Sequence, residues 1–230
     1  MSYQLNREID LLKRVFLSLS TRVEENVALA AEAFQGLDAT KAGTVIMNDI
    51  EINREEIDVE EECLKILALH QPVATDLRYI ISILKINNYL ERIGDLAVSM
   101  AKKVQYIANT GTKTLPVDFD FGPIMEKVKW MLKHSLDSLV QVDAPLAREV
   151  CREDDVVDAQ KRAANDVIVT TLKATPEQCD VLLNVLSITR HLERIADHAA
   201  NIAEDVIYMV EGSIIRHTGA KLEGNRQIQF

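Results

Sequence analysis

Residues that interrupt helices or favour strands are scarce in this sequence. The 230 residues include 8 glycines and 5 prolines, and only 5% of them are aromatic. Glycine and proline destabilise helix interiors, while aromatic residues are enriched in strands. No segment alternates apolar and polar residues in the manner of a half-buried strand. Because 47% of the residues are hydrophobic, the chain can still fill a core, and its composition favours helices.

Cysteine is equally scarce. Cys63, Cys151 and Cys179 are odd in number, and no two of them form a CxxC pair. This pattern argues against a disulfide framework and against a zinc ribbon. It predicts a reducing environment, and therefore a cytoplasmic protein.

Long apolar runs and basic clusters are missing as well. The first residues, MSYQLNREIDLLKR, are charged and lack the apolar core of a signal peptide. No run approaches the roughly 18 residues of a membrane span, and Lys85 interrupts the best candidate, YIISILKINNYL. The net charge is −10 and Lys and Arg do not gather in any run, so a nucleic acid is not an expected partner. An acidic surface instead suits bound cations, or simply solubility.

Six segments place apolar residues three and four positions apart, which is the spacing of an amphipathic helix. The predicted helices span residues 4–35, 38–70, 73–109, 124–142, 146–173 and 176–211. Pro72 and Gly212 mark two of the ends, and Gly43 is expected to weaken the start of the second helix. Residues 110–123, TGTKTLPVDFDFGP, form the predicted linker, and residues 217–230 form a tail predicted to be polar and frayed.

One phrase occurs twice in the chain. Residues 90–97 read LERIGDLA, and residues 192–199, 102 positions later, read LERIADHA. The apolar stripes of the two helices that carry the phrase are in register at the same offset. The repeat therefore indicates internal duplication. We expect an all-α fold of two tandem, internally duplicated three-helix bundles, covering residues 1–112 and 113–230.

Each copy of the phrase combines core residues with a pair of carboxylates. The apolar members lie on the predicted core stripes: Leu90, Ile93, Leu192 and Ile195. The acidic members stand four residues apart, so each pair shares one helical face: Glu91 with Asp95, and Glu193 with Asp197. Like charges at this spacing repel one another, and their repetition calls for an explanation.

Further side chains with oxygen ligands precede each copy of the phrase, on the neighbouring predicted helix. The first half offers Asp49, Asn53, Glu56 and Glu60 along one helical face. The second half offers Asp154 and Asp158. Aligning Asp49 with Asp154, at an offset of 105 residues, places Lys161 where Glu56 stands, so this half is poorer in ligands. His198, next to Asp197, is a further candidate. Oxygen ligands from two helices would hold a metal cation. The alternative is a solvated acidic face whose charges are offset by neighbouring Arg and Lys.

Signals for catalysis are weak. None of the five histidines follows a Glu at the spacing Glu-x-x-His, which the di-iron proteins of helical bundles require. No Gly-rich phosphate loop and no GxSxG motif is present. We therefore expect a protein that is not an enzyme. The enzymatic alternative is a metal-dependent hydrolase in which bridged metals on helix-borne carboxylates activate water.

Three motifs together resemble the PhoU family, whose members regulate phosphate transport: HQPVATDLRYI at 70–80, LERIGDLA at 90–97 and RHLERIADHAANI at 190–202. The resemblance extends over nearly the whole chain and implies two tandem three-helix bundles. It also implies a cytoplasmic negative regulator of phosphate uptake and of the phosphate-starvation response. Such a regulator would act through the ATPase subunit of the phosphate ABC transporter and a phosphate-sensing histidine kinase, and would associate with the membrane only through these complexes.

The resemblance also implies a metal and a homodimer. Some members carry multinuclear iron or other metal clusters on the bundle surface, held by paired E(D)xxxD motifs. Glu91 with Asp95 and Glu193 with Asp197 match that motif, and the partner pairs are Glu56 with Glu60 and Asp154 with Asp158. The implied cofactor is iron, with Mn, Mg, Zn or Ni as the other candidates.

Overall fold

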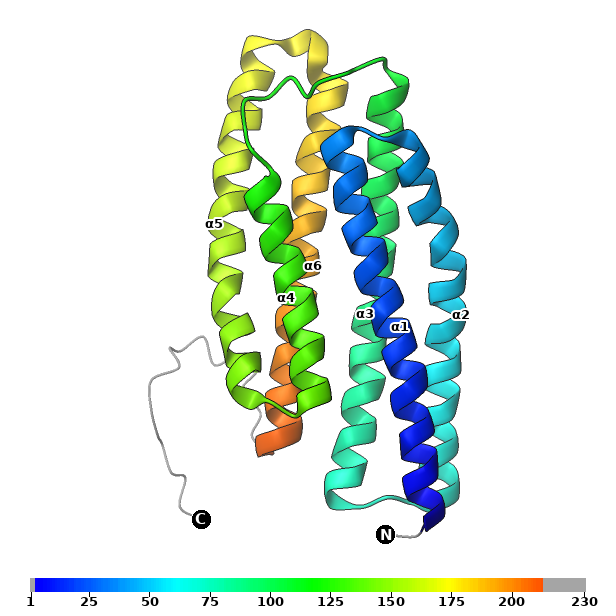
Figure 1. Cartoon of the computed structure of the whole chain (residues 1–230). Helices are drawn as coiled ribbons and strands as arrows, with labels where there is room; N and C mark the ends of the chain where they lie inside the picture. Colours follow the sequence, from blue (N-terminus) through cyan, green and yellow to red (C-terminus); the bar gives the residue numbers. More distant parts are fainter. Residues whose placement is uncertain (1–2, 213–230) are drawn as a thin grey trace.

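A computed structural model of the chain describes residues 3–212, and all regular structure in that range is helical (Figure 1). The elements are α1 (Tyr3–Gly36), α2 (Ala39–His70), α3 (Ala74–Asn109), α4 (Gly122–Gln141), α5 (Ala144–Ala174), a short 3₁₀ helix η1 (Pro176–Gln178) and α6 (Cys179–Glu211). The predicted all-α fold is confirmed. The tail predicted for residues 217–230 lies outside the described residues.

The start of α2 differs from the expectation that Gly43 would weaken it. The helix runs without interruption from Ala39, because Oδ1 of Asp38 accepts hydrogen bonds from the backbone N–H groups of Thr40 and Lys41 at 2.8 and 3.0 Å. Such a cap satisfies N–H groups that the first turn leaves without partners, and contributes about 1 kcal/mol. That contribution offsets the similar cost of one glycine in a helix.

The start of the last helix is also corrected. Pro176 begins the 3₁₀ turn η1, and α6 itself begins at Cys179, after the predicted start at residue 176. Proline is common at the first position of a helix, where its missing N–H group costs nothing. The proline signal therefore located the turn correctly but not the type of helix that follows it.

The predicted apolar stripes form the core. Leu90, Ile93 and Ile195 have no exposed surface, and Leu192 is 1% exposed. The buried side chains of both bundles join into one continuous apolar cluster. The 3.6-residue periodicity of the sequence therefore identified the core-facing side of each long helix.

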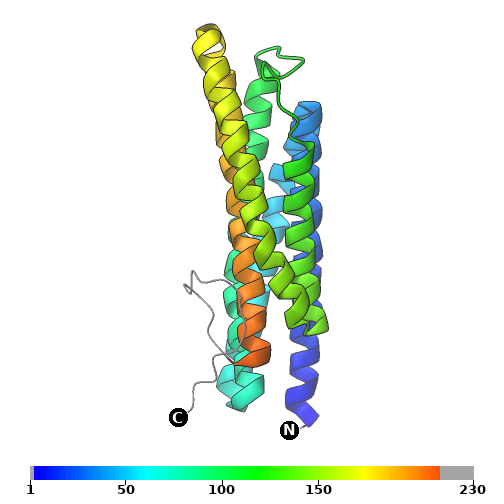
Figure 2. The same cartoon turned by 90° about the vertical axis from the view of Figure 1, so that its left-hand side faces the viewer.

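The two bundles lie side by side with their long axes roughly parallel (Figures 1 and 2). Helix α3 packs against α6 and α1 touches α4, while α2 and α5 lie on opposite outer flanks. Helix α4 has 20 residues and α1 has 34. Because α4 is short, the first bundle extends beyond the second at the end that carries the start of α1 and the end of α6 (Figure 1).

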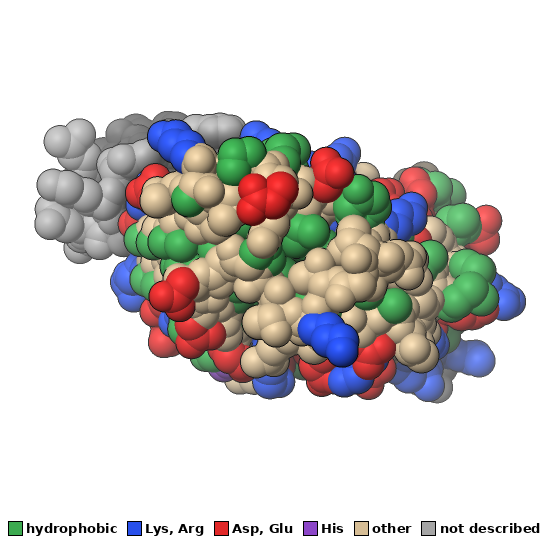
Figure 3. Space-filling model, turned by 90° about the horizontal axis from the view of Figure 1, so that it is seen from above, with side chains coloured by type: hydrophobic (Ala, Val, Ile, Leu, Met, Phe, Trp, Pro, Cys, Tyr) green, Lys and Arg blue, Asp and Glu red, His purple; other side chains and the backbone are tan. Residues whose placement is uncertain are grey.

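Figure 3 shows the molecule from the end that is uppermost in Figure 1. On this face, acidic and basic side chains are interspersed among apolar and neutral ones. Within residues 3–212, none of the helices has the length and apolar character needed to cross a membrane.

Candidate metal centre

Helices α2 and α3 bring together the first acidic cluster, which we define as Asp49, Glu56, Glu60, Glu91 and Asp95. Burial of Leu90 and Ile93 in the core fixes the rotation of α3. Glu91, one residue after Leu90, is turned by about 100° from the core stripe. On that side α3 packs against α2, so carboxylates from two helices share one flank of the bundle.

Gly94 permits a close approach between Asp49 of α2 and the backbone of α3. A Cβ atom at Gly94 would lie 3.2 Å from Oδ1 of Asp49, which is tighter than most Cβ contacts. Asn53 donates a hydrogen bond of 3.1 Å to Oδ2 of Asp49. Oδ1 of the same carboxylate is buried and has no hydrogen-bond partner among residues 3–212. A buried acceptor without a donor is costly, and this oxygen is therefore suited to accept a cation.

Desolvation and mutual repulsion raise the pKa values of three carboxylates in the first cluster. Desolvation and then the charge of Asp95 raise the pKa of Asp49 above its ordinary value, although Asn53 and Lys102 partly oppose the rise. Desolvation and Asp95 likewise raise the pKa of Glu91. For Glu56, the causes of a raised pKa are desolvation and then Glu60 and Glu91. A bound cation would relieve this repulsion.

Asn87 holds Glu56 in place, which the sequence did not reveal. Its Nδ2 donates to Oε1 of Glu56 at 2.8 Å and to the Glu56 backbone carbonyl at 3.0 Å. Asn87 is only 2% exposed. A polar residue one helical turn before Glu91, at a position that must face the neighbouring helix, is the signal that could have identified it.

Helices α5 and α6 form the second acidic cluster, Asp154, Asp158, Glu193 and Asp197. Desolvation, followed by the charges of Asp197 and Asp158, raises the pKa of Asp154 to about 6. Desolvation and then Glu193 raise the pKa of Asp197, although Lys161 partly opposes the rise. The two halves thus repeat one arrangement of carboxylates on adjacent helices.

The second cluster differs from the first because lysine and arginine side chains form ion pairs with two of its carboxylates. Nζ of Lys161 lies 2.7 Å from Oε1 of Glu193, and Nη1 of Arg162 lies 3.3 Å from Oδ2 of Asp158. Two of its four carboxylates are therefore already in ion pairs. A metal ion would have to displace the Lys161 ammonium group to use Glu193.

His198 directly follows Asp197 of the second cluster, and its ring lies at the contact between α3 and α6. Its ring stacks on Tyr89 with centroids 5.8 Å apart and an interplanar angle of 29°. Burial, with Arg194 and Arg92 nearby, lowers the pKa of His198 to about 4. Its neutral ring therefore belongs to the packing between the two bundles.

The donor chemistry fits a hard cation better in the first cluster than in the second. Carboxylate oxygens are common ligands of Mg²⁺, Mn²⁺ and Ca²⁺. The first cluster supplies five carboxylates, and the buried Oδ1 of Asp49 has no hydrogen-bond partner within the described part of the chain. In the conformation described for residues 3–212, no three His, Cys, Asp or Glu side chains are arranged to hold a metal ion. Any coordination would therefore need side-chain movement and ligands from water.

Comparison with known proteins assigns both halves to one family. Residues 16–104 and residues 123–206 match the PhoU domain. The chain belongs to the PhoU family. Each matched stretch contains one acidic cluster and one copy of the repeated octapeptide, so the duplication expected from the sequence is a duplication of the PhoU domain.

Curated relatives are similar over the whole length. One from Pseudomonas aeruginosa, named phosphate-specific transport system accessory protein PhoU homolog, is 37% identical over 232 residues, which cover 98% of this chain and 95% of the relative. One from Aquifex aeolicus with the same name is 34% identical over 221 residues, which cover 96% of this chain and 99% of the relative. The resemblance to the PhoU family that the motifs indicated is confirmed.

Solved PhoU structures share the fold. The crystal structure of PhoU from Pseudomonas aeruginosa matches with a TM-score of 0.86 at 36% identity, covering 90% of this chain and 99% of that chain. The PhoU structure from Streptococcus pneumoniae matches with a TM-score of 0.82 at 28% identity, covering 92% and 99%. The paired three-helix bundles are therefore the PhoU architecture.

Proposed function

We propose that this chain is a cytoplasmic regulator of phosphate transport that restrains phosphate uptake and the phosphate-starvation response. The observation that carries the proposal is similarity over the full length to relatives named as accessory proteins of the phosphate-specific transport system. As a non-enzymatic adaptor, it would bind the ATPase subunit of the phosphate ABC transporter and a phosphate-sensing histidine kinase. We also expect a homodimer. The relatives' names give no support to the hydrolase alternative.

Helix-rich architecture suits an adaptor. The long helices present extended outer flanks on α2 and α5, away from the contact between the bundles (Figure 1). Both acidic clusters lie beside these flanks. A cation bound there would offset carboxylate repulsion and order the local surface, so metal binding could modify how a partner docks.

In the first cluster, Asp49, Glu91 and Asp95 would hold the metal, with Glu56 and Glu60 as further ligands. A divalent cation supplies charge neutralisation and no redox step is required. The role of the protein is to orient its carboxylates: Gly94 lets Asp49 approach α3, and Asn87 fixes Glu56. In the second cluster, Asp154, Asp158 and Asp197 would bind a cation more weakly, because Lys161 occupies Glu193.

The regulatory role can be tested in a bacterium that lacks its own PhoU protein. Expression of this chain should lower phosphate uptake in phosphate-rich medium. Purified ATPase subunit and histidine kinase should each be retained by the immobilised chain, and retention should fall after chelation. Unchanged uptake together with no retention of either partner would overturn the proposed function.

Metal binding can be tested separately by elemental analysis of the purified protein. The double variant Glu91→Ala, Asp95→Ala should lose metal. The matched control is Glu149→Ala, Asp166→Ala, which removes two exposed carboxylates of α5 outside both clusters. Equal metal content in the wild type and the first variant would show that Glu91 and Asp95 are not ligands.

A further inference from the structure

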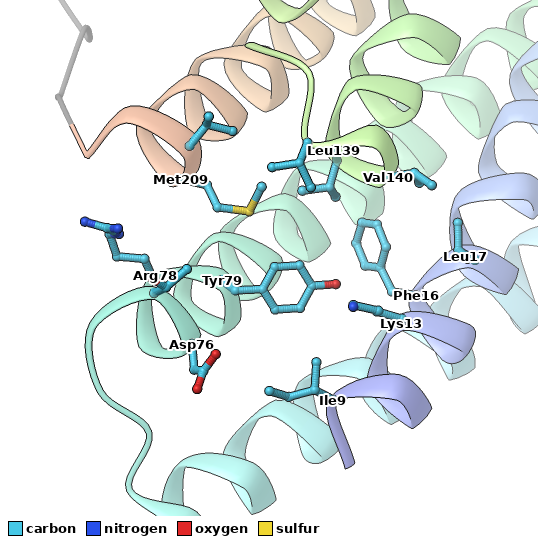
Figure 4. A pocket seen from close by; sticks show the side chains of 13 residues that line it. Ile9, Lys13, Phe16, Leu17, Asp76, Arg78, Tyr79, Leu139, Val140 and Met209 are labelled. Atoms are coloured by element: carbon cyan, nitrogen blue, oxygen red, sulfur yellow. The ribbon is translucent and has the colours of Figure 1, made fainter. Parts of the chain in front are cut away.

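A pocket of about 460 Å³ opens where the first bundle extends beyond the second. Its lining comes from α1, α3, the end of α4 with the turn that follows it, and the end of α6 (Figure 4). Pockets that bind small molecules commonly measure about 300–1,000 Å³, are mostly apolar and contain a few converging polar groups. This pocket has that size, and neither acidic cluster contributes to it.

The motif HQPVATDLRYI supplies one wall. Thr75, Asp76, Arg78 and Tyr79 of this motif all line the pocket. The candidate metal centre uses none of these four residues, so the motif has no role in the function proposed above. Lining a binding site would give the motif a role.

The polar end of the pocket is formed by Lys13 and Tyr79. Figure 4 shows the Tyr79 hydroxyl and the Lys13 ammonium group directed into the same space, and Nζ of Lys13 lies 5.7 Å from the Tyr79 ring centroid. Burial raises the pKa of Tyr79 above its ordinary value, with Cys63 and Asp10 contributing less, so the hydroxyl is a proton donor at neutral pH. Two donors thus converge, which suits an oxyanion.

Lys13 is available for a ligand. Its ion pair is with Asp10 at 4.0 Å, and the two side chains are 52% and 69% exposed. An exposed pair at this separation contributes little. A ligand that places an oxyanion beside Lys13 inside the pocket would gain a stronger, less hydrated interaction.

The rest of the lining is mostly apolar. In Figure 4, Phe16 lies beside Lys13 and Tyr79, and Leu139 and Met209 lie farther from this pair. Leu139 and Met209 are 3% and 5% exposed, whereas Val140 at the rim is 55% exposed. An exposed aliphatic rim above a buried apolar floor is suited to the hydrocarbon part of a ligand.

Two more charged residues, Asp76 and Arg78, line the pocket. Arg78 reaches the end of α6, where its Nη1 would lie 3.0 Å from a Cβ at Gly212. Nε of Arg78 is buried without a hydrogen-bond partner among the described residues. Asp76 is the one carboxylate in the lining, against two cations. Figure 4 shows the Arg78 guanidinium group directed away from Lys13 and Tyr79, so Lys13 is the cation of the lining that lies beside the Tyr79 hydroxyl and would attract an anion there.

We propose that this pocket binds a small amphipathic molecule with an apolar body and an oxyanion head, either a carboxylate or a phosphate monoester. The head would lie between Lys13 and Tyr79, and the body against Phe16, Leu139 and Met209. The site goes beyond the regulatory function proposed above and does not depend on it. Because both bundles line the pocket, an occupant would contact both PhoU domains at once.

Calorimetric titration of the full chain with decanoate, decyl phosphate and decyltrimethylammonium tests the proposal. At least one of the two anions should bind, and the cation should bind at least about tenfold more weakly. Which anion binds more tightly then distinguishes a carboxylate from a phosphate head. Equal binding of anions and cation, or no binding of either anion at about 1 mM, would overturn the proposal.

Two variants with matched controls locate the binding. Val140→Trp should fill the rim and weaken anion binding about tenfold or more, whereas Val169→Trp, at a similarly exposed valine of α5, should not. Lys13→Gln should remove most of the preference for anions over the cation, whereas Lys173→Gln, also on α5, should keep it. If each variant behaves like its control, the pocket is not the binding site.

Discussion

The ammonium nitrogen of Lys161 lies 2.7 Å from Oε1 of Glu193. At the corresponding position of the first bundle stands Glu56, whose Oε1 accepts a hydrogen bond from the neutral amide of Asn87. One position thus carries a cation in the second acidic cluster and a carboxylate in the first. An internal cation competes with a bound metal for the same oxygens. The duplicated bundles are therefore alike in fold, but we expect them to differ in metal affinity.

We expect Lys161 to limit the metal affinity of the second cluster. Lys161→Glu should raise Mn²⁺ affinity at the second cluster by about an order of magnitude, because it removes a competing charge and adds a ligand. The measurement is a calorimetric Mn²⁺ titration in a Glu91→Ala, Asp95→Ala background, which isolates the second cluster. Lys161→Gln, which only removes the charge, should give an intermediate affinity. If Lys161→Glu binds Mn²⁺ no more tightly than the background protein, Lys161 does not limit this site.

Gly94→Ala should lower the Mn²⁺ affinity of the first cluster while changing the free energy of unfolding only slightly. Alanine is favoured over glycine in a helix interior by about 1 kcal/mol, but the new Cβ would lie 3.2 Å from Oδ1 of Asp49 and 3.4 Å from Cγ2 of Ile52. These opposing effects should keep the change in unfolding free energy within about 1 kcal/mol, as measured by urea denaturation. Mn²⁺ affinity should fall, because the Asp49 carboxylate must move. An unchanged affinity would mean that the position of Asp49 is unimportant for the metal.

The helices and the core could be predicted from the sequence because both depend on local periodicity. Leu90, Ile93 and their counterparts repeat at helical spacing, and burial of one face is the physical cause of that spacing. The expectation for the start of α2 was wrong because the cap at Asp38 offsets the cost of Gly43. Aspartate before a helix is itself a start signal, so the sequence contains the information that predicts this start.

The candidate site was predictable only in part. The position of Glu91 and Asp95 relative to the core stripe of α3 predicts that they face α2 and its carboxylates, since both helices belong to one bundle. The stacking of His198 on Tyr89 depends on how α3 packs against α6, which periodicity within one helix does not specify. The pocket lined by Lys13 and Tyr79 depends on the difference in length between α1 and α4. The periodicity of single helices therefore does not predict the contacts between the two bundles.

Two of the three cysteines should resist alkylation in the folded protein. Burial raises the pKa of Cys63 and of Cys151 to about 12. At about pH 8 only a fraction on the order of 10⁻⁴ of such a thiol is the reactive thiolate. Iodoacetamide should therefore label the native chain mainly at Cys179, and Cys179→Ser should abolish the rapid phase seen by mass spectrometry. In denaturant all three cysteines should react, and rapid native labelling of Cys63 would contradict the buried core around it.

Acid should destabilise the contact between the bundles through His198. Burial, with Arg194 and Arg92 nearby, lowers the pKa of His198 from 6.5 to about 4 in the folded chain. Between these two pH values the unfolded chain binds the proton and the folded chain does not. The stability contributed by the neutral ring is therefore complete above about pH 6.5 and is lost as the pH falls towards about 4.

His198→Gln should remove this part of the pH dependence. The variant loses the stacking on Tyr89 at every pH, so it should be less stable than the wild type near neutrality. Between about pH 7.5 and about pH 5, however, it should lose less stability than the wild type, by about 1 kcal/mol after allowance for solvent screening. Urea denaturation at the two pH values measures this difference, and His191, whose pKa is also lowered by burial, is present in both proteins and cancels. If both proteins lose the same free energy of unfolding between the two pH values, the pKa of His198 is not lowered by its burial between α3 and α6.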